Sequence, residues 1–351
     1  MVILFYIILV LIPVNLGKHF IFDFSYSEGI LIDYAVPTLY LQDLLIILFL
    51  ALYILANRTL PKKVIYVLPL VFLLLLNSAF STNVLASLYF ASRIIIYTFF
   101  SLVGWKYAKK ISSTSLLLGG CLSLSLLGAL SIAQWYLQSS VFNNYLFFGE
   151  QPYSLLTSGI LHHMFLGDAV IPPYAVFKHP NILGGYLSIV LIWLSSWLFY
   201  SQKKSTWLHA LVFTSLLLGT LILFLTFSYS AWLSLSVGYV FLFLRIYKPQ
   251  IARMLMPLIV LLIFTLGMFG FFTSYRANQS TSLARRLTLI QSSVHLFKRH
   301  PFVGTGLNTN AFLNKDTPYF VREVNFYQPV HNIYWLLLSE GGLILFIPFV
   351  L

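Results

Sequence analysis

The chain has 351 residues, of which 59% are hydrophobic, 17% are aromatic and only 9% are charged, and its formal net charge is +12. A soluble domain usually has about a quarter of its residues charged, so this composition excludes an ordinary soluble protein and predicts an all-α, polytopic membrane protein. The single cysteine, Cys121, excludes an intrachain disulfide and a cysteine-based metal site.

The apolar runs predict ten membrane spans. The first run has no Lys or Arg before it and no small-residue cleavage signal, so we interpret it as a span and not as a removed signal peptide. A span needs about 20 apolar residues. We therefore expect a single integral membrane domain over residues 1–351. Its candidate spans are residues 2–17, 40–56, 64–78, 84–105, 112–138, 181–200, 207–227, 229–244, 255–272 and 332–351.

The basic residues between the spans predict the orientation. The loops after the second, fourth, sixth and eighth spans hold 11 of the 21 Lys and Arg residues and no acid. These loops are then cytoplasmic by the positive-inside rule, and so are both termini. The long segments 18–39, 139–180 and 273–330 fall outside, the last between the final two spans. Long loops on a rigid scaffold commonly carry function, so we expect the site there. No phosphate-binding glycine loop is present.

The fourth span and the second long segment hold scattered polar candidates. Arg93 lies in the middle of the fourth span, where a charge usually faces a polar cavity, although a structural pair or snorkelling is the alternative. His162, His163 and Asp168 form a cluster, but their spacing fits no metal-ligand motif, so no metal site is predicted.

A His-Pro-Asn sequence opens the sixth span from outside. It contains His179 and Asn181. Its structural interpretation is a turn, or capping of the helix by Asn181.

The last long segment carries seven basic residues against two acids. It contains an apolar stripe at helical spacing, formed by Leu283, Leu287, Ile290, Val294 and Phe297. At about 100° per residue, Arg286 falls about 60° from the centre of the stripe and Arg285 falls nearly opposite, so we expect Arg285 to face water. This is either a helix resting on anionic lipid headgroups or a helix whose Arg286 forks onto a phosphate.

The sequence PFVGTGLN follows this helix, at residues 301–308. Its two glycines predict a tight turn with close backbone approach. An anion-binding nest is the alternative, with a weaker signal.

The last span opens with His331 and Asn332. Histidine gains or loses a proton near neutral pH, so at a membrane mouth it suits general-base work on a hydroxyl, although an interfacial histidine that only bonds a loop is the alternative. Glu340 lies nine positions on, about half a turn round and ~13 Å deeper. It therefore cannot orient His331 directly along this helix. We expect it to support helix packing beside Gly341 and Gly342.

The order of these motifs resembles the O-antigen ligase and O-antigen polymerase superfamily. The resemblance rests on Thr226-Phe-Ser228, then Arg286-Leu followed by HPFVGTGLN, then His331-Asn and Glu340-x-Gly342 in the next helix. It is motif-specific over about 226–342, within a ligase-like region of about 181–351.

The resemblance implies a fold like that of the C-type glycosyltransferases and a metal-independent enzyme of the bacterial inner membrane, active on its outer side. Such enzymes move a glycan from a polyprenyl-pyrophosphate carrier to an acceptor hydroxyl on a glycan, a lipid such as lipid A core, or a protein. No cofactor and no nucleic acid is implied. His331 would be the general base, and Arg286, with Arg93, would bind the pyrophosphate. The supporting positions would be Asn332, Glu340, Arg285, His179 and Asn181.

Two departures from the family pattern keep alternatives open. The family often has an arginine after the Ser of Thr-x-Ser, where this chain has Tyr229, so Arg93 or another basic residue supplies the second charge or pyrophosphate binding is weaker. Family members usually continue past the Glu-x-Gly helix, whereas this chain stops at Leu351. The alternatives are an inactive truncated member and a flippase for lipid-linked glycans. A transporter would spread its charges along a central pathway.

Overall fold

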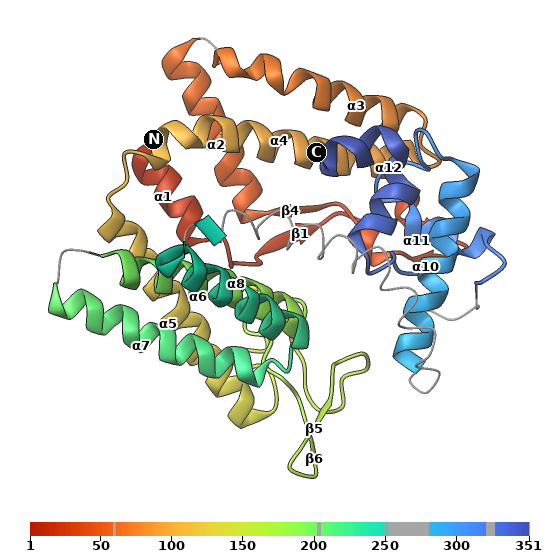
Figure 1. Ribbon diagram of the computed structural model, residues 1–351. Coiled ribbons are helices and arrows are strands. Elements are labelled where there is room, and N and C mark those ends of the chain that lie inside the picture. The colour runs from red at the N-terminus through yellow and green to blue at the C-terminus, as the bar shows by residue number, and fades with distance from the viewer. Residues whose placement is uncertain (59–60, 202–204, 249, 252–280, 321–326, 351) are drawn as a thin grey trace. The chain divides into compact units, whose positions relative to one another are not determined.

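The computed structural model describes residues 1–58, 61–201, 205–248, 250–251, 281–320 and 327–350. Helices make up most of these residues, as Figure 1 shows. They are α1 (Val2–Val10), α2 (Leu41–Asn57), α3 (Leu68–Ala79), α4 (Val84–Ala108), α5 (Ser113–Leu137), α6 (Pro180–Tyr200), α7 (Thr206–Leu225), α8 (Tyr229–Tyr247), α10 (Thr281–Arg299), α11 (Asn310–Leu313) and α12 (Ile333–Val350).

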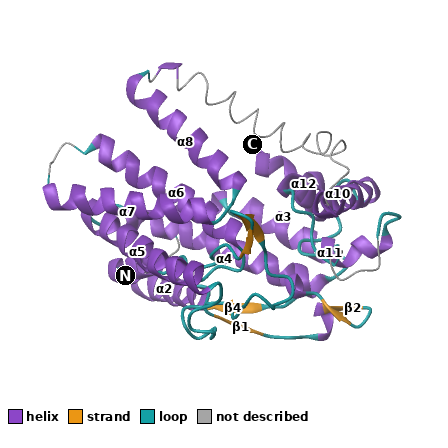
Figure 2. Ribbon diagram, turned by 90° about the horizontal axis from the view of Figure 1, so that it is seen from below, coloured by secondary structure: helices purple, strands orange, loops and turns teal. Residues whose placement is uncertain are grey.

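Strand is confined to short pieces, drawn in orange in Figure 2. The strands are β1 (Gly17–His19), β2 (Tyr26–Ser27), β3 (Ile30–Leu31), β4 (Thr38–Tyr40), β5 (His163–Phe165) and β6 (Asp168–Val170). They form three two-stranded sheets, β1 with β4, β2 with β3 and β5 with β6.

Six helices within the described part of the chain are long and apolar enough to cross a membrane, namely α4, α5, α6, α7, α8 and α12. The predicted helical, polytopic class is thus supported, although α2 and α3 are shorter apolar helices. The predicted span 255–272 lies outside the described residues. Large apolar side chains such as Leu126 of α5, which is 62% exposed, suit helices that face lipid.

Prolines explain two boundaries that differ from the predicted spans. The run 2–17 does not form one helix, since α1 ends at Val10 and Pro13 lies in the turn that follows. Proline has no N–H to donate and its ring clashes with the preceding turn. The third span begins as a 3-10 helix, Lys62–Tyr66, and α3 starts afresh with Pro69 in its first turn, where proline is tolerated.

The contacts divide the chain into two units. Unit 1 comprises Met1–Lys18, Tyr40–Tyr53 and Gly104–Met256. Its helices α5 to α8 pack around a core in which Leu124, Leu191 and Ile222 are fully buried. Gly184 of α6 lies so close to Ala231 of α8 that a side chain there would press on it, which is how small residues let apolar helices approach.

A buried pair of polar side chains fixes the long segment after α5. The carboxylate of Glu150 accepts hydrogen bonds from the N–H groups of Val141 and Phe142 at 2.8 and 2.7 Å, and from Gln134 Nε2 at 2.7 Å. Gln134 in turn accepts from the N–H of Ala175 at 2.7 Å. Both side chains are buried, and their polar atoms are hydrogen-bonded. Together they hold the segment near both of its ends.

Unit 2 comprises His19–Leu39, Ile54–Val103 and Pro257–Leu351. Within it α12 packs against both α3 and α10. One apolar cluster joins Leu74, Leu307 and Leu345. Another joins Leu289 and Val330, and the start of α12 packs against it. The described part of the last long segment is therefore folded onto the last span.

Candidate functional site

A break in α12 shapes the site. Gly342 has φ 58° and ψ −165°, so the helix is interrupted there. A break leaves backbone groups without partners inside the helix. Two of them reach the loop after α10, because the N–H of Leu343 donates to the carbonyl of Pro301 at 2.9 Å and the N–H of Ile344 donates to that of Phe302 at 3.1 Å.

The same loop satisfies carbonyls on the other side of the break. The N–H of Thr305 donates to the carbonyl of Ser339 at 3.0 Å, and the N–H of Gly306 donates to that of Glu340 at 2.9 Å. Gly304 has φ 75°, and a side chain there would overlap the Glu340 carbonyl. The predicted turn with close backbone approach is therefore confirmed, and it serves to complete a broken helix.

The loop also holds the carboxyl group of Glu340. Its Oε2 accepts from the N–H of Asn308 and its Oε1 from the N–H of Asn310, both at 2.9 Å. Glu340 is only 5% exposed, and both of its buried oxygens are satisfied by backbone N–H groups. These N–H groups are occupied from within the protein, so the alternative of a nest for a phosphate ligand is wrong for them.

Asn77 of α3 fixes the loop from the other side. Its Nδ2 donates to the carbonyls of Val303 and Glu340 at 2.7 and 2.8 Å, and its Oδ1 accepts from the N–H of Leu307 at 2.9 Å. Asn77 is fully buried. Sequence reasoning missed Asn77. The signal was an asparagine inside the apolar run LLLLNSA, since a buried amide needs hydrogen-bond partners.

The structure places His331 within electrostatic range of Arg286. His331 is exposed on one face, and the protein around the ring partly dehydrates it. This burial lowers the pKa of His331 below its ordinary value, and the positive charge of Arg286 lowers the pKa further. The imidazole is thus held neutral at neutral pH, which is the form that can take a proton.

The orientation of α10 differs from the prediction. Arg286 is exposed and Arg285 is half-buried, which is the reverse of what the apolar stripe predicted. In the predicted stripe Ile290 is buried, whereas Leu287, Val294 and Phe297 are half-buried. The buried face instead contains Ser292 and Ser293, between Leu289 and Leu296.

Hydrogen bonds account for the two buried serines of α10. Ser292 shares a hydrogen bond of 2.9 Å with Thr317, and Ser293 accepts one of 3.0 Å from Asn310. Apolar periodicity does not register serines that are buried by polar contacts.

Asn332 caps α12. Its Oδ1 accepts hydrogen bonds from the N–H groups of Tyr334 and Trp335 at 3.0 and 3.2 Å, which is what an N-cap side chain does. The cap fixes the point at which the chain turns from His331 into the helix.

Arg93 belongs to unit 2, but the contacts described for it are with tyrosines of its own helix. Its Nη2 donates to the hydroxyl of Tyr97 at 2.8 Å, and its guanidinium lies 5.9 and 5.5 Å from the ring centroids of Tyr89 and Tyr97. These contacts fit the structural alternative for Arg93, and they do not join it to His331. A role of Arg93 in binding the pyrophosphate of the donor stays a prediction.

His179 and Asn181 belong to unit 1. The Nδ1 of His179 accepts from the N–H of Asn181 at 3.1 Å, so the histidine caps α6. The expectation that Asn181 is the capping side chain is wrong. The reason is that His179 occupies the N-cap position in extended backbone, one residue before Pro180.

The remaining sequence candidates also lie in unit 1. Thr226 and Ser228 are buried in the short connection from α7 to α8, whereas Tyr229 is 67% exposed. The ring of His163 lies 4.1 Å from that of Phe227. Over the described ranges, no three His, Cys, Asp or Glu side chains are placed to hold a metal ion together.

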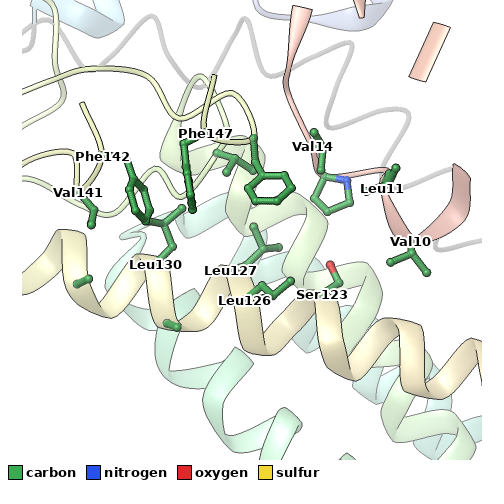
Figure 3. Close-up of a pocket in the computed structure, with 15 residues that line it drawn as sticks. Val10, Leu11, Val14, Ser123, Leu126, Leu127, Leu130, Val141, Phe142 and Phe147 are labelled. Carbon is green, nitrogen blue, oxygen red and sulfur yellow. The ribbon is translucent and has the colours of Figure 1, made fainter. Parts of the chain in front are cut away.

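Unit 1 contains an apolar pocket of about 390 Å³ between α1, α5 and the segment after α5. In Figure 3 the stacked rings of Phe142 and Phe147 lie over Leu130 of α5. Ser123 is the polar side chain in this lining, and its hydroxyl is 2.8 Å from the hydroxyl of Tyr186. The pocket has volume for a ligand, but its lining residues supply no acid, base or cation for chemistry.

The comparisons with known proteins concern the C-terminal part of the chain. No curated protein and no solved structure shows significant similarity to the chain. The sequence model of the family described as O-Antigen ligase matches residues 214–350, which include Arg286, His331 and Glu340. The resemblance to the O-antigen ligase and polymerase superfamily is thereby confirmed for this C-terminal part of the chain.

Proposed function

We propose that the protein is a membrane glycosyltransferase that moves a glycan from a polyprenyl-pyrophosphate carrier to an acceptor hydroxyl on the outer side of a bacterial inner membrane. One observation carries this proposal: an exposed histidine lies within electrostatic range of an exposed arginine in the segment that matches the O-antigen ligases. The six candidate membrane spans fit a substrate that is itself anchored in the lipid bilayer.

In this reaction the neutral imidazole of His331 takes the proton of the acceptor hydroxyl. The oxygen attacks the anomeric carbon as the bond from that carbon to the pyrophosphate oxygen breaks. The pyrophosphate leaves with the electron pair, and the Arg286 guanidinium stabilises its charge. The low pKa of His331 suits this role, because the base is already neutral when the acceptor arrives.

A pyrophosphate carries more charge than one arginine balances. Arg285, half-buried next to Arg286, and Arg93 are the candidate second cations in unit 2. With two guanidinium groups on the leaving group, the scheme requires no metal ion.

The test is a transfer assay in a bacterial strain that lacks its own ligase and polymerase and is supplied with lipid-linked glycan. Long glycan ladders on the carrier would identify a polymerase, and glycan on lipid A core or on protein would identify a ligase. The product should also form in purified protein treated with EDTA. A folded protein that forms no product, or that only moves the carrier across the bilayer, would contradict the proposal and favour an inactive member or a flippase.

Arg286→Gln is expected to change both the rate and the pH dependence of transfer. Loss of a group that stabilises charge in the transition state lowers the maximal rate by about 10²-fold. Removal of the neighbouring positive charge raises the pKa of His331, so a higher pH is needed to keep the imidazole neutral. The acid limb of the pH–rate profile should therefore move to higher pH.

Arg299→Gln is the matched control for Arg286→Gln. Arg299 is an exposed arginine at the other end of α10. Its replacement should leave the acid limb in place. An Arg286→Gln protein with the wild-type acid limb would show that the guanidinium does not act on His331.

A further inference from the structure

Asn310 occupies the point where the three parts of the site meet. It is the first residue of α11 and is fully buried. Its side chain touches α10, which carries Arg286, α12, which carries Glu340, and the segment that carries His331. Asn310 itself makes no contact with Arg286 or His331 among the described hydrogen bonds.

Every hydrogen-bonding group of the Asn310 amide is used. Its Nδ2 donates to the hydroxyls of Ser293 and Ser339, each at 3.0 Å, and its Oδ1 accepts from the N–H of Val330 at 3.0 Å. Val330 is buried and directly precedes His331. Asn310 thus fixes the backbone from which the imidazole projects.

The contact with Ser293 links the same amide to Arg286. Arg286 lies seven residues before Ser293, which at about 100° per residue places the two on nearly the same face of α10. That face is turned toward Asn310 at Ser293. The Asn310 amide bonds both Ser293 and Val330, so it fixes α10 against the backbone before His331. It thereby also fixes the separation between the guanidinium of Arg286 and the imidazole of His331.

Glu340 anchors Asn310 from the interior. Its Oε1 accepts from the N–H of Asn310 at 2.9 Å. Glu340 is too far along α12 to orient His331 directly, but the structure supplies an indirect route. This indirect connection runs from the side chain of Glu340 to the backbone N–H of Asn310. It continues from the side-chain amide of Asn310 to the backbone beside His331.

We propose that Asn310 is a positioning residue that holds His331 in place beside Arg286, with Glu340 as its anchor. This inference rests on the proposed function for its catalytic meaning, but the geometry is independent of it. The amide ties together two helices and a loop that are distant in the sequence, and it does so at the residue before the base.

The charged groups on the helices packed near His331 set the electrostatic environment of its imidazole. On α10 these are Arg285 and Arg286, with His295 two turns further on, and on α12 the group is Glu340, whose carboxylate is bonded to the loop. Among the described residues, Arg286 is the one whose positive charge lowers the pKa of His331. If Asn310 holds the imidazole in its partly dehydrated place near Arg286, removing the Asn310 side chain should bring the pKa of His331 back toward its ordinary value.

The test is chemical modification of His331 in purified protein in lipid nanodiscs. Diethyl pyrocarbonate reacts with neutral imidazole, so the rate of modification of the His331 peptide against pH, measured by mass spectrometry, gives the pKa of that ring. In Asn310→Ala the midpoint should rise toward the ordinary pKa of histidine. A folded Asn310→Ala protein with the wild-type midpoint would overturn the proposal.

A pair of serine variants keeps the test decisive if Asn310→Ala does not fold. Ser293→Ala removes the α10 partner of Asn310, and its midpoint should also rise. Ser292→Ala is the matched control, because Ser292 is equally buried on α10 but bonds Thr317 and not Asn310. Equal midpoints in the two serine variants would overturn the proposal.

The transfer assay separates this proposal from the proposed function. Asn310→Ala should lose more transfer at pH 6 than at pH 8, whereas a merely destabilised protein would lose the same fraction at both. If the wild type transfers no glycan but the modification midpoint still shifts in Asn310→Ala, the proposed function fails and the positioning role stands. If the wild type transfers glycan and Asn310→Ala loses it equally at both pH values, the positioning role fails.

Discussion

Replacing His331 with alanine is expected to lower glycan transfer by about 10²- to 10⁴-fold, the usual contribution of a general base. The acceptor hydroxyl then has no group to take its proton as it attacks the anomeric carbon. The protein should stay folded, because His331 is exposed on one face and a surface substitution usually changes the free energy of unfolding by less than about 0.5 kcal/mol. The measurement is transfer per folded molecule, with the folded amount taken from thermal unfolding in detergent.

His300→Ala is the control for this effect. His300 is exposed at the end of α10, and its described bond to Gly304 is made by its backbone carbonyl. Its replacement should leave transfer near the wild-type level. Full transfer by a folded His331→Ala protein would exclude His331 as the base, and the exposed arginine would then need another partner.

The sequence predicted the helical class because apolar runs report burial and lipid exposure directly. It also pointed to His331 and Arg286 as candidates, since both lie in motifs whose order is informative without a fold, and their roles stay predictions. It did not identify Asn77 and Asn310, because their partners are far away in the chain. Asn77 bonds residues 226 to 263 positions further on. Only the folded structure shows that these two amides hold one loop.

The orientation of α10 could not be read from the sequence for a related reason. Hydrophobic periodicity assumes that apolar side chains mark the buried face. On α10 the buried face contains two serines whose hydroxyls find Thr317 and Asn310. The same limitation affected Glu340, whose spacing from His331 excluded a direct contact but could not show the loop that connects them.

Gly342→Ala is expected to prevent unit 2 from folding stably. At φ 58° and ψ −165° the backbone lies in a region that only glycine adopts readily, so a side chain adds strain of about 1–3 kcal/mol. The added carbon would also overlap the carbonyl of Phe302, which cannot withdraw without losing its bond to the N–H of Ile344. The yield of folded protein and its thermal midpoint in detergent should both fall sharply.

Gly185→Ala is the matched control, because Gly185 lies within α6 and a side chain there would meet no atom within 4 Å. Alanine is a better helix former than glycine by roughly 0.5–1 kcal/mol, so this variant should be as stable as the wild type or slightly more. If both variants unfold at the same temperature, the break at Gly342 does not need glycine, and the loop of residues 301–306 is not what completes the helix. If Gly342→Ala alone unfolds, the glycines of the last span are explained by backbone geometry. The place of Gly342 in the motif then comes from the loop of residues 301–306, which bonds the backbone on both sides of the break.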